Sequence, residues 1–340
     1  MSSIFSRRRW LAGVLAIAVS APFVAVIASG AGDGASAAPA PVIKHKLLLL
    51  DESRPQVLYV DETNPANNWS FPLKGTHGWG FQLVGNNRLL VSLKDFGGFR
   101  EYDLATRKTV VNVVNKSRYG QVSCAVRLPD GGTLISSPRG RDSQFVRFAK
   151  ADAKGQCKEI AKWKLPFGGV RQIRLTKRGT FLAADGGNSV YECSIADAGG
   201  AGKILRKRSV PGAKQIYQVS ELPNGNLLLG GGYAGFMAEL GWEGDILRRW
   251  GNGNPKSTGA GYYYMSQFHV LKNGNIVSAT WTGHGANDSR KHQQVVEFAP
   301  DGTVVWKWHD PKAAGSIHGV YVMDELDPQK LFDDTTGATK

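Results

Sequence analysis

Short apolar segments alternate with polar turns through most of the chain, from residue 46 to residue 324. In each recurring unit a short strand ends in a turn such as Asn-Gly or Asp-Gly, and a second apolar strand follows at once. These turn residues tolerate the positive φ values of tight hairpins, so each unit is predicted to be a β-hairpin. The leucine that precedes each turn, which we call the anchor, recurs every 45 to 49 residues, at Leu83, Leu128, Leu175, Leu222 and Leu271.

Each unit continues with a third and a fourth strand, and a period of this size is typical of four-stranded propeller blades. Five blades are complete. Three N-terminal strands, KLLLLDE, QVLYVDE and NWSFPL, and one orphan strand, Ile317 to Met323, remain. Val322 lies 51 residues after Leu271, where the sixth anchor should fall. The sequence therefore predicts an all-β, six-bladed β-propeller in which the C-terminal strand completes the N-terminal blade and removes an open sheet edge. The polar residues 327–340 are expected to form a short frayed tail.

The first 37 residues have the pattern of a signal peptide. Arg7, Arg8 and Arg9 precede an uncharged apolar run over residues 10–31, and Ala35-Ser36-Ala37 offers a cleavage site. The segment from Ser6 to Leu11 resembles a twin-arginine export signal, which implies a periplasmic or secreted protein. We expect a signal peptide over 1–37 and one propeller over 38–326. The alternative is an uncleaved anchor, the one membrane contact that the sequence suggests.

The net charge of +14 falls to +12 without residues 1–37, and the basic residues are scattered rather than gathered in blocks. Such a charge favours solubility and a general attraction to anions. Nucleic acid is not an expected partner, because no recognition motif is present. We expect a monomer. No motif requires a cofactor, and no metal is expected, although Asp288 and His292 stand four residues apart.

Three cysteines, Cys124, Cys157 and Cys193, lack the spacings of zinc, haem or redox motifs. An oxidising compartment would allow one disulfide and one buried thiol. The alternative is that Cys124 is a small core residue.

A propeller usually binds ligands at the mouth of its channel, where the inner strands begin. Counting back four residues from each anchor predicts the ring of side chains there: Trp79, Cys124, Arg171, Gln218, Gln267 and His318. This ring is more polar than a core requires, so it is a candidate ligand site, and the alternative is a channel that holds only water. His269 falls on the apolar row of its strand and is expected to be a core histidine.

Loops predicted on the same face add a second layer of candidates, which are His77, Arg139, Tyr233, Tyr263 and His284. Arginine binds carboxylate, sulfate or phosphate with two hydrogen bonds, and flat rings stack on sugars or aryl groups. A small anionic ligand, either carbohydrate or aromatic, is therefore expected. The candidate catalytic residues are His318, His284 and Tyr263, and the candidate binding residues are Arg171, Gln218, Gln267, Trp79, His77, Arg139 and Tyr233.

The segments LPNGNLLL (222–229) and EFAPDGTVVWKWHD (297–310) resemble the blades of bacterial arylsulfotransferase-like and quinoprotein-like propellers. In arylsulfotransferase-like repeats a His-Asp or His-His pair opens the inner strand, whereas this chain has Ser266 and Gln267 there. The resemblance thus implies the fold and no complete catalytic set.

Three function classes remain open: a lyase or transferase that uses His318 or His284 as acid or base, a binding module of the cell envelope, and an envelope scaffold. Convergence of His284, His318 and an arginine within hydrogen-bond reach on one pocket would favour catalysis, whereas dispersed side chains around an open channel would favour binding.

Overall fold

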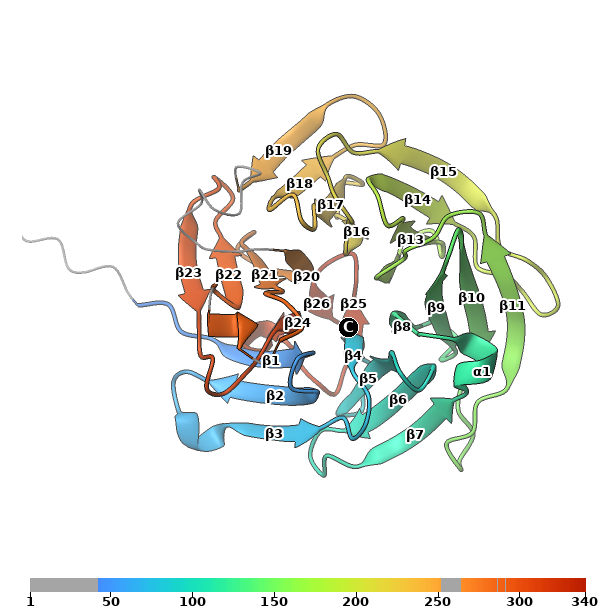
Figure 1. The fold of residues 1–340 in the computed structure, drawn as a ribbon, viewed down its shortest axis with the longest axis horizontal. Helices are drawn as coiled ribbons and strands as arrows, with labels where there is room; N and C mark the ends of the chain where they lie inside the picture. Colours follow the sequence, from blue (N-terminus) through green and yellow to red (C-terminus); the bar gives the residue numbers. More distant parts are fainter. Residues whose placement is uncertain (1–41, 252–263, 286, 291) are drawn as a thin grey trace, which may run out of the picture. The chain divides into compact units, whose positions relative to one another are not determined.

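Six four-stranded antiparallel sheets are arranged around a central channel, so the chain is a six-bladed β-propeller, as the repeat predicts (Figure 1). The computed structural model describes residues 42–251, 264–285, 287–290 and 292–340. The expected signal peptide and Tyr263 lie outside these residues. Within them, no helix is long and apolar enough to cross a membrane.

The strands of each blade follow one another from the channel to the rim. The N-terminal blade contains β24 (Ile317–Val322), β1 (Lys46–Asp51), β2 (Gln56–Asp61) and β3 (Trp69–Pro72). The second contains β4 (Gly78–Leu83), β5 (Arg88–Leu93), β6 (Gly98–Asp103) and β7 (Thr109–Val114). The third contains β8 (Cys124–Arg127), β9 (Thr133–Arg139), β10 (Asp142–Phe148) and β11 (Glu159–Leu165). The fourth contains β12 (Ile173–Leu175), β13 (Phe181–Ala184), β14 (Ser189–Cys193) and β15 (Ile204–Ser209). The fifth contains β16 (Val219–Glu221), β17 (Leu227–Gly230), β18 (Met237–Leu240) and β19 (Ile246–Trp250). The sixth contains β20 (Met265–Val270), β21 (Ile276–Thr280), β22 (Val295–Phe298) and β23 (Val304–Trp308).

Short helical segments lie in the connections. They are η1 (Pro65–Asn67), α1 (Lys116–Tyr119), η2 (Asp288–Arg290) and η3 (Met323–Glu325).

The core lies between neighbouring blades. Leu83, Leu128 and Leu271 are buried at their anchor positions, while Leu175 and Leu222 are half-buried and each packs against an apolar cluster. In the Asn-Gly turn of the fifth blade, Gly225 has a φ of 85°, a conformation that side chains with a Cβ rarely adopt. The turn chemistry therefore fixes the hairpins, and the anchors hold adjacent sheets together.

Antiparallel pairing of β1 with β24 closes the ring, as predicted. Leu47 pairs with Val322 and Leu49 with Val320, and all four side chains are almost completely buried. The pairing joins segments from the two ends of the chain and covers the inner edge of β1.

A buried histidine reinforces this closure where the N-terminal and sixth blades meet. His45 Nε2 lies 2.9 Å from Glu297 Oε2 and His45 Nδ1 lies 2.9 Å from Asp324 Oδ2. Burial alone would lower the pKa of His45, but the two carboxylates outweigh it and raise the pKa above 6.5.

The residues expected to form a frayed tail instead form a C-terminal hairpin, residues 327–340, with β25 (Phe332–Asp333) and β26 (Ala338–Thr339). Figure 1 shows it at the centre of the ring. Phe332 is buried with its ring 4.5 Å from that of Tyr321, and His269 Nε2 lies 2.7 Å from the carbonyl oxygen of Gly337. The expectation of fraying is wrong, because one aromatic ring and several backbone groups of this segment pack against the inner strands of the channel.

All three cysteines, which lie within the described residues, are free thiols, so the structure contains none of the disulfides that the sequence would allow. Cys124 and Cys193 are buried, and Cys157 is half-buried. Burial raises the pKa of each thiol, and an activated nucleophile requires the opposite.

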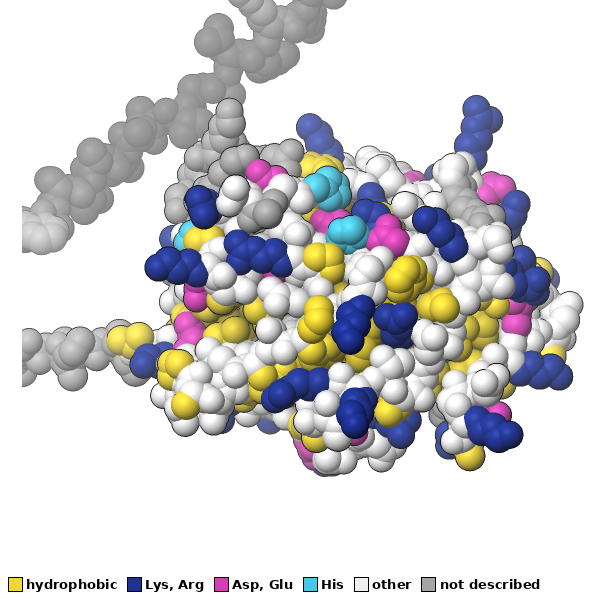
Figure 2. Space-filling model, turned by 60° about the horizontal axis from the view of Figure 1, so that its bottom comes forward, with side chains coloured by type: hydrophobic (Ala, Val, Ile, Leu, Met, Phe, Trp, Pro, Cys, Tyr) yellow, Lys and Arg dark blue, Asp and Glu magenta, His cyan; other side chains and the backbone are white. Residues whose placement is uncertain are grey.

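Lysine and arginine side chains are spread over the face shown in Figure 2 rather than gathered in one patch, as the sequence indicates.

His45→Gln tests how much the contacts of His45 between the N-terminal and sixth blades contribute to stability. Because the folded pKa of His45 lies above 6.5, its contribution is complete below pH 6.5 and is lost as the pH rises through the folded pKa. Urea unfolding should show the variant to be about 1 to 3 kcal/mol less stable than wild type at about pH 5.5, with a smaller gap at about pH 9. Replacement of the exposed His309 by Gln is the control. An equal difference in unfolding free energy between wild type and variant at both pH values would contradict a stabilising role of protonated His45.

Candidate functional site

A cavity of about 240 Å³ opens at the mouth of the channel where the inner strands begin. We call it the channel-mouth cup. It is lined by Trp79, Lys94, Gln121, Arg171, Gln215, Tyr217, Tyr233, Tyr264, Trp281, His284 and His318. Cavities of about 420 Å³ and 560 Å³ lie elsewhere, lined by turns of the second to fourth blades and by the C-terminal hairpin, but neither is lined by a histidine or tryptophan.

The buried carboxylate of Glu52 lies at the base of the cup and is 1% exposed. Trp79 Nε1 donates a hydrogen bond to Glu52 Oε1 at 3.0 Å, and Trp281 Nε1 donates to Oε2 at 2.7 Å. The two tryptophans come from the second and sixth blades, on either side of the blade that carries Glu52. A carboxylate held by two indoles is a rigid centre around which the other side chains are arranged.

The surroundings of Glu52 keep it ionised. Burial alone would raise the pKa of Glu52, but its attraction to His318 when that ring is protonated, the two indole donors and His284 lower it to about 2. Lys94 Nζ lies 3.6 Å from Glu52 Oε1 and adds a further positive charge.

His318 forms part of the floor of the cup. Its Nε2 lies 3.8 Å from Glu52 Oε2, and its ring centroid is 5.3 Å from that of Tyr217 and 5.8 Å from that of Trp281. Burial lowers the pKa of His318 to about 4 against the opposing attraction of Glu52, so the ring is neutral at pH 7. Among the described residues its Nδ1 has no hydrogen-bond partner, and a buried polar atom of this kind requires an explanation such as a ligand or an ordered water.

His284 lies at the rim, and 70% of its side chain is exposed. Its Nδ1 lies 3.2 Å from Glu52 Oε2, and its ring centroid is 4.8 Å from that of Trp281. A carboxylate next to Nδ1 favours the tautomer that carries its proton there, which leaves the Nε2 lone pair available to solvent or a substrate.

The cup has an arginine that no carboxylate neutralises among the described residues. The guanidinium carbon of Arg171 lies 4.5 Å from the centroid of the Trp79 ring. With its amide oxygen turned toward Arg171, Gln215 accepts hydrogen bonds from Arg171 Nη2 at 2.8 Å and Nε at 3.3 Å. Gln215 has a φ of 58°, which is uncommon for a residue with a Cβ. The contacts orient Arg171 while its charge remains available for an anion.

Aromatic rings form most of the wall. Tyr233 and Tyr264 pack edge to face with centroids 4.6 Å apart, and Tyr264 lies 5.8 Å from Tyr217 in the same manner. Tyr233 is 38% exposed, whereas Tyr264 and Tyr217 are buried. Burial raises the pKa of Tyr264 and of Tyr217, so both hydroxyls stay protonated at neutral pH.

The structure gathers five of the sequence-predicted site residues into the cup, namely Trp79, Arg171, Tyr233, His284 and His318. Their roles stay predictions.

Of the other five candidates, three lie outside the cup and two have no described side chain. Gln218 is buried deeper in the channel and accepts a hydrogen bond from Arg174. Gln267 is fully buried in β20, and His77 pairs with Asp95 at 2.6 Å outside the cup. The side chain of Arg139 and the whole of Tyr263 lie outside what the structure describes.

Sequence reasoning missed Glu52 and Lys94, which follow β1 and β5. In the first two blades these residues begin the loops between the second and third strands, and none of the predicted site residues lies in those two loops. The Asp-Glu pair after the apolar run KLLLL was the available signal. His269 is a core histidine as expected, since it accepts a hydrogen bond from the backbone N–H of Val322 through Nδ1 at 3.1 Å.

Over the described part of the chain, no group of three or more His, Cys, Asp or Glu side chains is arranged to hold a metal ion.

His318→Asn tests the burial of a neutral histidine in the floor. The unfolded chain binds a proton at His318 near pH 6.5, while the folded protein does so only near pH 4, so stability falls as the pH drops through this window. Between about pH 7 and pH 4.5 wild type should lose about 2 to 3 kcal/mol more than the variant in urea unfolding. Parallel pH dependences in the two proteins would contradict a buried neutral histidine.

No family model matches the chain, and no curated protein sequence matches it. Solved structures do match. A protein of unknown function from Bacteroides caccae has a TM-score of 0.65 at 22% identity, over 82% of this chain and 98% of that one. A streptogramin B lyase has a TM-score of 0.53 at 11% identity, over 78% and 88%. A chain of the nidogen/laminin complex has a TM-score of 0.56 at 10% identity, over 82% and 97%. At these identities the similarity shows the propeller fold alone.

Proposed function

We propose that this protein binds a small anionic aryl or carbohydrate ligand in the channel-mouth cup. The observation that carries the proposal is the convergence of five aromatic side chains, two histidines, Arg171 and Lys94 on one cavity. Flat rings stack on aryl groups and on the apolar faces of sugars, and arginine binds carboxylate, sulfate or phosphate through paired N–H groups.

The size and charge of the cup narrow the ligand class. A cavity of about 240 Å³ is smaller than the range of about 300 to 1,000 Å³ typical of drug-sized ligands, which favours a single ring. Arg171 and Lys94 carry two positive charges against the one negative charge of Glu52. A monoanion would therefore neutralise the cup.

Arg171→Gln tests the binding site directly. Phenyl sulfate, phenyl phosphate, benzoate and glucuronate are suitable probes, because each combines one ring with one anionic group. For the tightest probe, isothermal titration calorimetry should show affinity reduced about 10- to 100-fold, as expected for loss of one charged hydrogen-bonding group.

Arg141→Gln is the matched control, since Arg141 is exposed outside the cup and its loss changes the net charge equally. Equal weakening in both variants would indicate general charge attraction and would overturn the assigned site.

The pair formed by His284 and Glu52 favours a second candidate function, that of a lyase. In a β-elimination, Nε2 of His284 would take the proton from the carbon next to a substrate carboxylate. The C–H electron pair would form the new carbon–carbon double bond as the bond from the β-carbon to oxygen breaks. The leaving oxygen would keep the electron pair of that C–O bond and take a proton from solvent. Arg171 and Lys94 would stabilise the charge that builds on the carboxylate, and Glu52 would hold the imidazole. The streptogramin B lyase shares the fold, but the lyase candidate rests on this geometry.

His284→Asn separates the two candidate functions. If the protein is a lyase, turnover of short oligouronides, followed by the ultraviolet absorbance of the new double bond, should fall about 100-fold or more while probe affinity changes little. His77→Asn, outside the cup, should retain activity. Binding of probes by wild type without turnover of any oligouronide would leave a binding protein and exclude elimination of these substrates.

Export to the periplasm or medium, which the N-terminal residues predict, is part of the proposal. A ligand of this kind would then be met outside the cytoplasm.

A further inference from the structure

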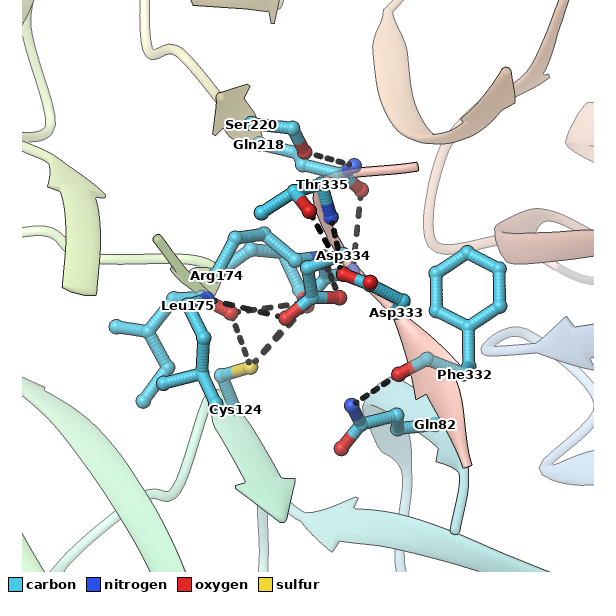
Figure 3. A network of polar contacts seen from close by, with 12 residues as sticks. Gln82, Cys124, Arg174, Leu175, Gln218, Ser220, Phe332, Asp333, Asp334 and Thr335 are labelled. Carbon is cyan, nitrogen blue, oxygen red and sulfur yellow. Dashed lines mark hydrogen bonds and ion pairs between the residues drawn. The ribbon is translucent and has the colours of Figure 1, made fainter. Parts of the chain in front are cut away.

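The C-terminal hairpin places a carboxylate inside the channel. Figure 3 shows Asp334 beside Arg174 of β12, where Asp334 Oδ1 lies 3.5 Å from Arg174 Nε. The backbone N–H of Leu175 donates to Asp334 Oδ2 at 3.1 Å. Both charged side chains are at most 3% exposed. Burial raises the pKa of Asp334 to about 6 and Arg174 opposes that rise, so the pair is charged at neutral pH.

Arg174 continues from this pair toward the cup. Its Nη1 donates to Gln172 Oε1 at 2.9 Å, and Gln172 Nε2 donates to the carbonyl oxygen of Trp79 at 2.9 Å. Gln172 Nε2 also lies 3.5 Å from the hydroxyl oxygen of Tyr217, and that hydroxyl donates to the same carbonyl. Trp79 and Tyr217 line the cup, and the Trp79 indole holds Glu52.

Asp334, Arg174 and Gln172 thus form one continuous series of contacts, which we call the channel tether. It begins in the C-terminal hairpin at one end of the channel and ends on two walls of the cup at the other.

We propose that Asp334 is a positioning residue for the cup, so that docking of the C-terminal hairpin and ligand binding in the cup strengthen each other. The inference rests on the proposed ligand binding and concerns its regulation. When the hairpin leaves, Arg174 loses its carboxylate inside the channel, where an uncompensated charge is costly. The guanidinium then has to move. The amide oxygen of Gln172 loses the charged one of its two donors and keeps only the Cys124 thiol, 3.2 Å away. By linkage, a ligand that requires the ordered cup stabilises the docked hairpin by the same factor.

Single substitutions in the tether carry a risk of unfolding, because Asp334→Asn leaves Arg174 buried without a counter-charge. The double variant Arg174→Met, Asp334→Leu removes both charges and keeps apolar volume, so it is the principal test, with Asp334→Asn beside it. Asp333→Asn is the matched control, because Asp333 bonds to Lys340 and Thr335 of its own hairpin and does not contact Arg174.

Two readouts test the coupling. With phenyl sulfate as probe, or whichever of the four probes binds wild type most tightly, the double variant should bind at least about fivefold more weakly and the control within about twofold. In wild type, saturating probe should slow hydrogen exchange of the Leu175 amide, which reports hairpin docking, by a similar factor. Unchanged affinity in the double variant together with unchanged Leu175 exchange would overturn the inference and leave the proposed ligand binding intact.

A third readout needs no ligand. Tyr217→Phe removes the hydroxyl that shares the Trp79 carbonyl with Gln172, so exchange of the hairpin amides of Leu331 and Lys340, which pair with each other, should quicken. If no probe binds wild type, the proposed function fails, and this comparison alone decides the tether. Faster exchange supports it, and exchange at the wild-type rate rejects it.

Discussion

The pairing of β1 with β24 is the interaction on which both the fold and the candidate site depend. It closes the ring between segments more than 260 residues apart, and it places Glu52, just after β1, next to His318 at the start of β24. The backbone N–H of Glu52 donates to the carbonyl oxygen of Ser316 at 2.9 Å, which fixes the carboxylate at the channel mouth. Without closure, the two indoles and the histidines would have no common centre.

The two ends of the channel differ in chemistry. One end is the channel-mouth cup, in which a buried carboxylate arranges cationic and aromatic side chains around open space. The other end is occupied by the C-terminal hairpin, whose Asp334 meets Arg174 inside the channel. A ligand of the cup would thus bind at one end of a channel whose opposite end is closed by the chain itself, and this arrangement is what makes coupling between the two ends physically reasonable.

The fold followed from the sequence because period and turn chemistry are local signals that each blade repeats. The positions of Trp79, Arg171 and His318 at the channel mouth could be predicted for the same reason, because a fixed offset from the anchor marks the start of each inner strand. Gln172 and Arg174 lie three residues and one residue before the anchor Leu175. A count in even steps from the anchor skips them, because side chains alternate between the two faces of a strand. Glu52 and Asp334 come from opposite ends of the chain. The contacts of Glu52 with Trp281 and of Asp334 with Leu175 join residues more than 150 positions apart, and no local pattern reveals such partners.

The most direct test of the cup is the response of its two tryptophans to a ligand. In a ¹H–¹⁵N spectrum of the indole groups, titration with phenyl sulfate should shift the Trp79 and Trp281 signals together, with one dissociation constant. The signal of Trp163, which packs between the third and fourth blades, should stay in place. Indole signals of Trp79 and Trp281 that do not move for phenyl sulfate or for any other single-ring anion would contradict the account.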